Sequence, residues 1–459
     1  MRLLLGILCI LFLLSGCATW HKRNAAFQQA VSIGQFEQAG KILNKDKKQS
    51  RDKNKILYYL NLGYVNFMMG QIEESNKAFE IAEQLTEEQR RNVLLETTAL
   101  ISNPEVRPYR PEDFEIIMIN VYKAMNYLQM NNMEDALVEA RKINIRLKQL
   151  NDKYPDHKNR YQRDAFAHLL MGLIYDASGN MNDAFIAYRN AYNIYQSDYA
   201  QNFGLTAPEQ LKQDLLRTAY RLGFTNELAQ FEKEFQQKYV PTQPSNNGDF
   251  VMFWMNGFGP VKAEWGLTFT KVDNGIGGIV FQNQELGLVF PFFWGNGYTD
   301  ADHNSLANVN VVRVVFPKYQ ERPLQFTHGI IKYNNTDYPL QKAEDINQIA
   351  FKTLRDRMVR ELSTSLLRVA VKQGIKQMAS RKNEWLGFAV DIANALTERA
   401  DTRNWQTLPY FISYARIPLN FADNQIEMIL SGPRIQTVKE QINIPATNRS
   451  TRFFIYTTL

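Results

Sequence analysis

Residues 168–195 read HLLMGLIYDASGNMNDAFIAYRNAYNIY, and small and aromatic residues recur in them at regular steps. Gly172 is followed by Tyr175 three residues on, by Gly179 at seven, by Ala184 at twelve and by Tyr188 at sixteen. Small residues at these steps let two antiparallel helices approach closely, while the aromatic rings fill the remaining space. The stretch therefore predicts a helix pair that turns at Gly179.

Two other stretches repeat these offsets. The matching residues are Gly63, Gly70, Phe79 and Ala82 in one stretch, and Ala124, Tyr127, Ala136 and Ala140 in the other. The pattern resembles the tetratricopeptide repeat. This resemblance predicts a helical repeat domain over residues 25–240, with inserted segments near 103–111 and 151–160, because the turns are unevenly spaced.

Solenoids of this kind generally bind a peptide or a protein in a concave groove. We expect the groove here to hold an envelope protein, with Tyr64, Tyr127 and Tyr175 as the residues that contact it. The alternative for each tyrosine is a place in the core, because large aromatic side chains are mostly buried when helices stack. The sequence leaves both interpretations open.

The composition changes over residues 241–248, which predict a linker. Segments rich in β-branched and aromatic residues then predict strands at 249–255, 266–272, 287–293, 308–316 and 324–333. Apolar residues at three- and four-residue steps predict helices over 342–379 and 383–400, and strands return at 425–431, 435–444 and 451–458. The expected fold is multidomain, an all-α tetratricopeptide-like solenoid followed by an α+β domain over 249–459 with a largely antiparallel sheet.

The amino-terminal residues indicate where in the cell the protein is located. Arg2 precedes an apolar run over 3–14, which is too short to span a membrane and is typical of a secretory signal. Leu14-Ser15-Gly16-Cys17 resembles the bacterial lipobox, in which the cysteine thiol receives a diacylglycerol. The resemblance implies a signal peptide over 1–16, lipidation at Cys17 and a lipidated tether over 17–24. Ala18 implies the outer membrane, with the protein facing the periplasm; a plain signal peptide with an incidental cysteine is the alternative.

Charge and cysteine content exclude several classes of protein. Lys and Arg number 53 against 47 Asp and Glu, and the densest basic run, 45–55, is interrupted by Asp46 and Asp52. We therefore expect no nucleic-acid partner. Cys9 would leave with the signal peptide and Cys17 would be acylated, so the mature chain would carry no disulfide and no free thiol.

Motifs for catalysis are missing from the sequence. Neither a G-x-S-x-G nucleophile elbow nor a P-loop occurs. Asp300, Asp302 and His303 could offer metal ligands, but no second ligand cluster follows at a recognisable spacing. We expect no catalytic residue, no metal and no small-molecule cofactor.

Several segments together are similar to an uncharacterised family of Gram-negative envelope lipoproteins with tetratricopeptide-like repeats in their amino-terminal half. The segments are 109–114, 120–128, 136–141, 256–262, 400–405, 408–409 and 415–416. The resemblance covers nearly the whole chain and implies a setting in cell-envelope or cell-wall assembly. It supplies no catalytic residues.

The leading hypothesis is a non-enzymatic, lipid-anchored periplasmic scaffold or adaptor that binds a partner protein through its helical repeats. The alternative is an envelope glycan-binding protein or hydrolase that acts through the carboxyl-terminal domain. Aromatic side chains that could stack on sugars there are Trp254, Trp265, Phe292, Phe293, Trp294 and Tyr298.

Overall fold

The computed structural model describes residues 20–45, 52–92, 107–152, 161–241, 248–273, 279–285, 287–292, 311–358, 400–419, 424–433, 435–444 and 451–459. The predicted signal peptide with Cys17, most of the linker, the 300–303 segment and nearly all of the helix over 383–400 lie outside these residues. Within the described ranges, no helix combines the length and apolar character that a membrane span requires.

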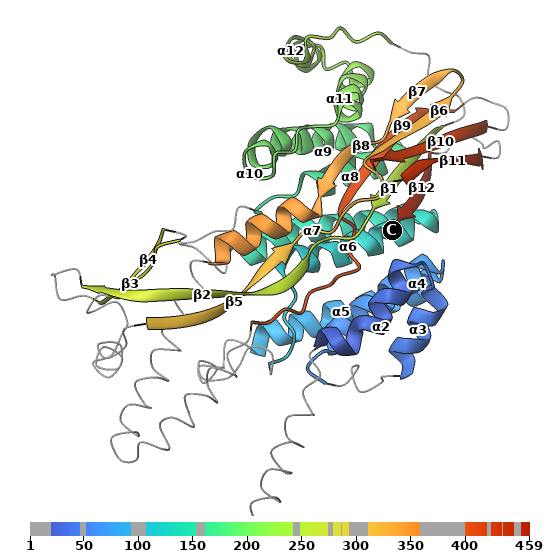
Figure 1. Cartoon of the computed structure of the whole chain (residues 1–459). Coiled ribbons are helices and arrows are strands. Elements are labelled where there is room, and N and C mark those ends of the chain that lie inside the picture. Colours follow the sequence, from blue (N-terminus) through green and yellow to red (C-terminus); the bar gives the residue numbers. More distant parts are fainter. Residues whose placement is uncertain are drawn as a thin grey trace, which may run out of the picture.

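Antiparallel helix pairs form the first half, as expected (Figure 1). The helices are α2 (Trp20–Ser32), α3 (Phe36–Lys45), α4 (Lys55–Met68), α5 (Ile72–Asn92), α6 (Asp113–Gln129), α7 (Met133–Asp152), α8 (Ala165–Ala177), α9 (Met181–Ile194), the π-helix η4 (Tyr195–Tyr199), α10 (Ala200–Phe203), α11 (Glu209–Leu222) and α12 (Thr225–Phe235).

The predicted role of the small residues is confirmed at two repeats. A Cβ atom at Gly172 would lie only 2.4 Å from the Tyr188 ring, and one at Gly63 would lie 2.6 Å from the Phe79 ring. The absence of a side chain therefore sets the distance between α8 and α9 and between α4 and α5. Gly179 makes its turn in the left-handed region, with φ of 80°.

Three four-stranded sheets follow. In order along each sheet they are sheet A, β12 (Arg452–Thr458), β1 (Asp249–Asn256), β9 (Phe411–Pro418) and β8 (Gln341–Asp345); sheet B, β4 (Leu288–Phe292), β3 (Ile279–Asn283), β2 (Val261–Asp273) and β5 (Val311–Gln320); and sheet C, β11 (Ile435–Ile444), β10 (Asn424–Gly432), β6 (His328–Tyr333) and β7 (Thr336–Pro339).

The α-then-α+β order and the largely antiparallel pairing are confirmed, since only β1 and β12 pair in parallel among these strands. The helix predicted to begin at residue 342 is wrong at its start. Residues 341–345 form β8, which pairs with β9, and the helix begins at residue 346. Its described part covers residues 346–358.

One hydrophobic core cluster runs through both halves of the chain. The Phe166 ring on α8 meets the Phe253 ring on β1 edge-on at 5.9 Å. Trp405, just before β9, lies 5.7 Å from the Phe79 ring and 5.5 Å from the Tyr122 ring. The boundaries 25–240 and 249–459 thus follow a change in secondary structure, while the larger core cluster is shared by the two halves. A second cluster, which includes Trp254, Phe411 and Ile426, lies within the carboxyl-terminal half alone.

Sheet A occupies one side of the helical repeats. β12 packs against α6, β8 packs against α8, and Figure 1 shows the carboxyl terminus beside α6. As a result α6 is buried almost all round, from Phe114 continuously to Asn126. The face that these helices would offer to a ligand in an open solenoid is covered by the chain itself.

Candidate binding site

Tyr64 lies in the core and not on a groove surface. Its side chain is 2% exposed, and its ring packs edge-on against the rings of Phe36 at 6.3 Å and Tyr122 at 6.2 Å. Burial also raises its pKa. The expectation that Tyr64 contacts a partner does not fit this position.

Tyr127 on α6 and Tyr175 on α8 are half-buried at the margin of the same core. The Tyr175 hydroxyl accepts a hydrogen bond from Arg141, whose guanidinium carbon lies 5.4 Å from the ring centroid. Tyr175 is therefore engaged with α7. Contact of Tyr127 and Tyr175 with a partner stays a prediction.

The aromatic residues of the alternative hypothesis separate into two groups. Trp254 is 1% exposed and its Nε1 donates to Thr458 Oγ1 at 2.9 Å, so it belongs to the core. Trp265 is half-buried and lines a cavity. Phe292 ends β4, whereas Phe293, Trp294 and Tyr298 lie outside the described residues.

The cavity beside Trp265 has a volume of about 680 Å³ and lies between β5 and the helix over 346–358. We call it the β5 groove. Apolar and cationic side chains line it together. The apolar ones include Trp265, Phe316, Phe351, Leu354 and Met358, and the cationic ones are Lys318, Lys352 and Arg355. Its size falls within the range of ligand-binding sites.

The helical wall of the β5 groove follows from helix periodicity. Gln348, Phe351, Arg355 and Met358 recur at three- and four-residue steps, so they lie along one face. The helix begins next to Asp345, whose Oδ1 accepts a hydrogen bond from the Gln348 backbone N–H at 2.9 Å. This contact fixes where the face points.

The strand wall is the edge of β5. Consecutive residues 316–319 all line the cavity, although successive side chains in a strand point to opposite faces. The Lys318 ammonium lies 5.8 Å from the centroid of the Trp265 ring. Glu321 also lines the groove, and its carboxylate accepts a hydrogen bond from the Tyr410 hydroxyl.

A buried carboxylate holds the two walls together. Glu112, 3% exposed at the start of α6, forms ion pairs with Lys262 on β2 and with Arg357 at 2.5 Å, on the helix over 346–358. Burial alone would raise the pKa of Glu112, but the charges of Arg357 and Lys262 outweigh burial and lower it. The carboxylate thus stays ionised and ties to α6 both the helical wall and β2, the strand that pairs with β5.

Glu115 lies one helical turn further along α6. Its carboxyl accepts hydrogen bonds from the Tyr109 hydroxyl, from the Glu112 backbone N–H at 2.8 Å and from the Trp405 backbone N–H at 2.7 Å. Burial, aided by the charge of Glu112, raises the pKa of Glu115 to about 7. The same capping box that begins α6 therefore also anchors the segment before β9.

Arg416 on β9 makes a second set of contacts between the halves. Its guanidinium lies 2.5 Å from Asp176 on α8 and 3.0 Å from Asp214 on α11, and it also pairs with Asp249 on β1. Burial tends to raise the pKa of Asp176, but Arg416 and Arg217 together lower it. Burial dominates for Asp214 and raises its pKa.

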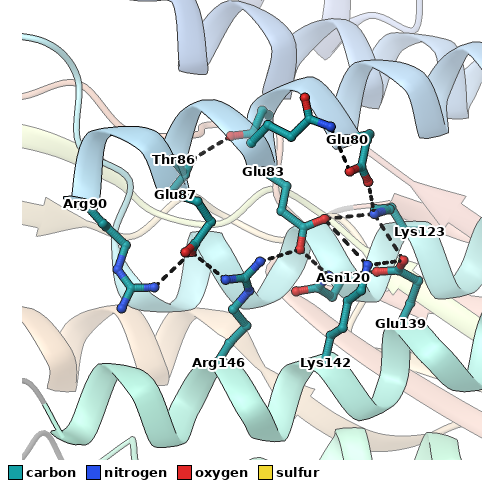
Figure 2. A network of polar contacts seen from close by, with 12 residues as sticks. Glu80, Glu83, Thr86, Glu87, Arg90, Asn120, Lys123, Glu139, Lys142 and Arg146 are labelled. Atoms are coloured by element: carbon teal, nitrogen blue, oxygen red, sulfur yellow. Dashed lines mark hydrogen bonds and ion pairs between the residues drawn. The ribbon is translucent and has the colours of Figure 1, made fainter. Parts of the chain in front are cut away.

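A third network lies within the repeats, where α5, α6 and α7 meet (Figure 2). The Lys123 ammonium, on a side chain that is 3% exposed, lies 2.6 Å from Glu80, 2.8 Å from Glu83 and 3.1 Å from Glu139. Arg146 lies 2.8 Å from the other oxygen of Glu83. Burial tends to raise the pKa of Glu83, but Lys123 and Arg146 lower it to about 2.

The sequence carried a signal for this network. Asn120 lies four residues before Ala124, at a position where the repeat pattern has Trp. Lys123 lies one residue before Ala124, where the pattern has Leu. Asn120 Nδ2 donates to Glu139 at 2.8 Å and to Glu83 at 3.2 Å. Polar residues at two positions that are apolar in the repeat pattern are therefore a signal in the sequence for a buried polar layer between repeats. Across the described ranges, no group of three or more His, Cys, Asp or Glu side chains is arranged to hold a metal ion.

No family model matches the sequence, and no curated protein matches it. Among solved structures the chain is similar to BtubC from P. vanneervenii, at 12% identity and a TM-score of 0.32, over 49% of this chain and 83% of that one. It is also similar to MamA, at 16% identity and a TM-score of 0.28, over 45% and 91%. A third similar structure is the Rap conjugation gene regulator of the plasmid pLS20 in complex with the Phr* peptide, at 13% identity and a TM-score of 0.27, over 47% of this chain and 54% of that one.

Proposed function

We propose that this protein is a lipid-anchored adaptor of the bacterial envelope, which binds a partner protein in the β5 groove. The observation that carries the proposal is the groove itself, with an aromatic floor beside a rim of Lys318, Lys352 and Arg355. Exposed concave surfaces of this composition are typical of sites that bind other molecules. The helical repeats then serve as the frame, because β12 and β8 of sheet A cover α6 and α8.

The rigidity of the groove supports this role. Glu112 pairs with the helical wall and with β2, the neighbour of β5, and Arg416 joins sheet A to α8 and α11. A site held in place by buried contacts binds with a smaller loss of conformational entropy. Membrane attachment through acylated Cys17, at the periplasmic face of the outer membrane, completes the proposal, and it requires neither a cofactor nor catalysis.

Site-specific crosslinking in cells tests the proposal. A photo-crosslinking amino acid replaces Arg355 in the groove or, as a matched control, Lys439, an exposed residue of β11. We expect one envelope protein to be captured from position 355 and not from position 439, and less of it when the chain also carries Cys17→Ser. Equal capture from both positions, or no protein adduct at position 355, would contradict the proposal.

Glycan binding is the second candidate, and Trp265 favours it, since its ring lies in the groove and could stack on a sugar. Purified full-length protein would then sediment with peptidoglycan, and Trp265→Ala would abolish sedimentation whereas Lys439→Glu would not. Sedimentation that is the same for all three proteins would rule out this candidate for the groove.

A further inference from the structure

We infer that the segment bound in the β5 groove is an extended, acidic peptide of the partner protein, which adds to β5 as a new outer strand. The inference rests on the proposed function and names the kind of partner that the groove fits. Three features of the groove support it, and each concerns a different part of the recognition.

The first feature is the position of β5. It is the outermost described strand of sheet B, in the order β4-β3-β2-β5, so only β2 pairs with it there. Backbone groups of an outer strand that point away from the sheet can pair with an added strand. Pro317 lies within β5 and has no N–H to donate, so an added strand could use only the carbonyl group of Pro317. It would take its N–H donors from Val315 and Tyr319, whose backbone the alternation along the strand directs the same way.

The second feature is the wall opposite this edge. The helix over 346–358 runs beside β5, with Phe351 and Met358 half-buried in the lining and Leu354 buried behind them. The Phe351 ring lies 6.0 Å from the Tyr319 ring of β5 and closes one end of the apolar part of the groove. An added strand would lie about 4.8 Å from β5, and every second side chain could then enter the apolar part of the groove. Outer strand, apolar groove and facing helix together form the arrangement in which peptides bind by strand addition.

The third feature is charge. Lys318 and Arg355 are exposed and Lys352 is half-buried, so cationic groups border the groove on both the strand and the helix. Glu321 is the acidic residue in the lining, and the Tyr410 hydroxyl donates to it. Carboxylates on the added peptide would form charge-assisted contacts with this rim.

Selection from a random peptide library tests the inference. The library displays peptides of 10 residues, the length of β5, and the target is the purified full-length chain carrying Cys17→Ser. We expect enriched peptides to alternate apolar residues with others that include Asp and Glu. The double variant Lys318→Glu with Arg355→Glu should bind them at least about tenfold more weakly, increasingly so at low salt. Lys439→Glu, on another outer strand, should bind them as the parent chain does.

Backbone pairing needs its own measurement. Methylation of alternate peptide nitrogens on the edge that faces β5 should abolish binding, whereas methylation on the opposite edge should leave it within about twofold. Amide resonances of residues 311–320 should shift when the unmethylated peptide binds. Equal effects of the two methylated peptides would overturn strand addition.

The outcomes separate the two proposals. If position 355 captures a partner in cells but the methylated peptides behave alike, then the adaptor role stands and strand addition is wrong. If selection yields no peptide, or yields peptides that bind the double variant equally well, then the inference fails as well. If position 355 captures no protein, then the proposed function itself fails.

Discussion

Lys123 illustrates at the scale of a single residue how this fold tolerates charge in its interior. Its ammonium is surrounded by three carboxylates from α5 and α7, and its pKa is raised because these carboxylates outweigh the effect of burial. A buried ion pair adds little stability over apolar packing, but the loss of one partner leaves a charge uncompensated. The network therefore adds little to the stability of the fold, but substitution of one of its members should lower the free energy of unfolding strongly.

Lys123→Met should lower the free energy of unfolding by up to about 3 to 5 kcal/mol, because Glu83 and Glu139 would lose their shared cation. Arg146 and Lys142, which still pair with these carboxylates, would reduce the loss. Chemical denaturation at neutral pH measures this change. Lys77→Met is the control, since the Lys77 pair with Glu74 is exposed and its loss should leave the free energy of unfolding nearly unchanged. Equal costs for the two variants would show that the Lys123 network has no special weight.

Glu115 should make stability fall as the pH rises. Its folded pKa of about 7 lies above the ordinary value of 4.5, so its contribution is fully present below pH 4.5 and is lost as the pH rises through 7. The loss amounts to about 3 kcal/mol. Denaturation at several pH values, for the parent chain and Glu115→Gln, should give a smaller decrease over this window in the variant. Identical pH profiles would contradict the assignment.

At the scale of the element, the repeats follow a rule that the sequence already contains. Gly63 and Gly172 each lie against an aromatic ring sixteen residues on, whereas the middle unit has Ala124 and Ala140 at these two positions. A missing Cβ and a large ring therefore occur together, and a methyl group occurs where the ring is absent. Helix pairs could be predicted because their contacts are local in sequence.

Gly172→Ala should test this rule. The added Cβ would meet the Tyr188 ring at 2.4 Å, so α8 and α9 must move apart, at a cost of about 1 to 3 kcal/mol. Thermal denaturation followed by circular dichroism measures the effect. Ala124→Gly is the matched control, in which the loss of about 1 to 2 kcal/mol comes from the backbone and from the buried methyl group, with no clash. A stabilised Gly172→Ala variant would show that the ring has room to move.

Two strands show what local patterns could not reveal. β9 is buried at seven consecutive positions, so it lacks the alternation of a half-exposed strand, and Arg416 interrupts its apolar run. β8 reads Gln-Lys-Ala-Glu-Asp and has no strand propensity of its own. β8 forms because its backbone hydrogen-bonds to β9, and β9 forms because its backbone hydrogen-bonds to β8 on one side and to β1 on the other.

Arg416→Met should therefore weaken the connection between sheet A and the repeats. The change leaves Asp176, Asp214 and Asp249 without their shared cation and should cost about 3 to 5 kcal/mol. Arg163→Met is the control, because its ion pair with Asp198 is largely exposed and should cost about 0 to 1 kcal/mol. Urea denaturation compares the two variants, and equal midpoints would contradict a joining role for Arg416.

At the scale of the whole molecule, the sequence predicted the order of elements but not their assembly. Of the strand residues that line the β5 groove, only Phe316 lies in a predicted strand, the one at 308–316; Trp265 and the residues from Pro317 to Glu321 lie outside the predicted strands, whereas the helix residues lie within the helix predicted from 342. Nothing local indicates that residues 316–321 and 348–358 face each other, because the contacts that place them are distant in sequence, such as the pair of Glu112 with Lys262, 150 residues on. The groove is thus a product of tertiary packing.

Because one core spans both halves, the chain should unfold in a single transition. Far-UV circular dichroism follows mainly the helices, whereas five of the six tryptophans lie after residue 248 and make fluorescence a probe of the second half. We expect the two denaturation curves to coincide. A helical signal that persists after the fluorescence change would indicate that the repeats fold independently.

The parallel pairing of β12 with β1 has a consequence for the order of folding. Trp254 on β1 and Thr458 on β12 are hydrogen-bonded partners that are 204 residues apart, so sheet A cannot be completed until the last residues of the chain are available. Until then the apolar side of α6 that β12 covers stays open to solvent and to other unfolded chains. We therefore expect chains that stop short of residue 452 to aggregate.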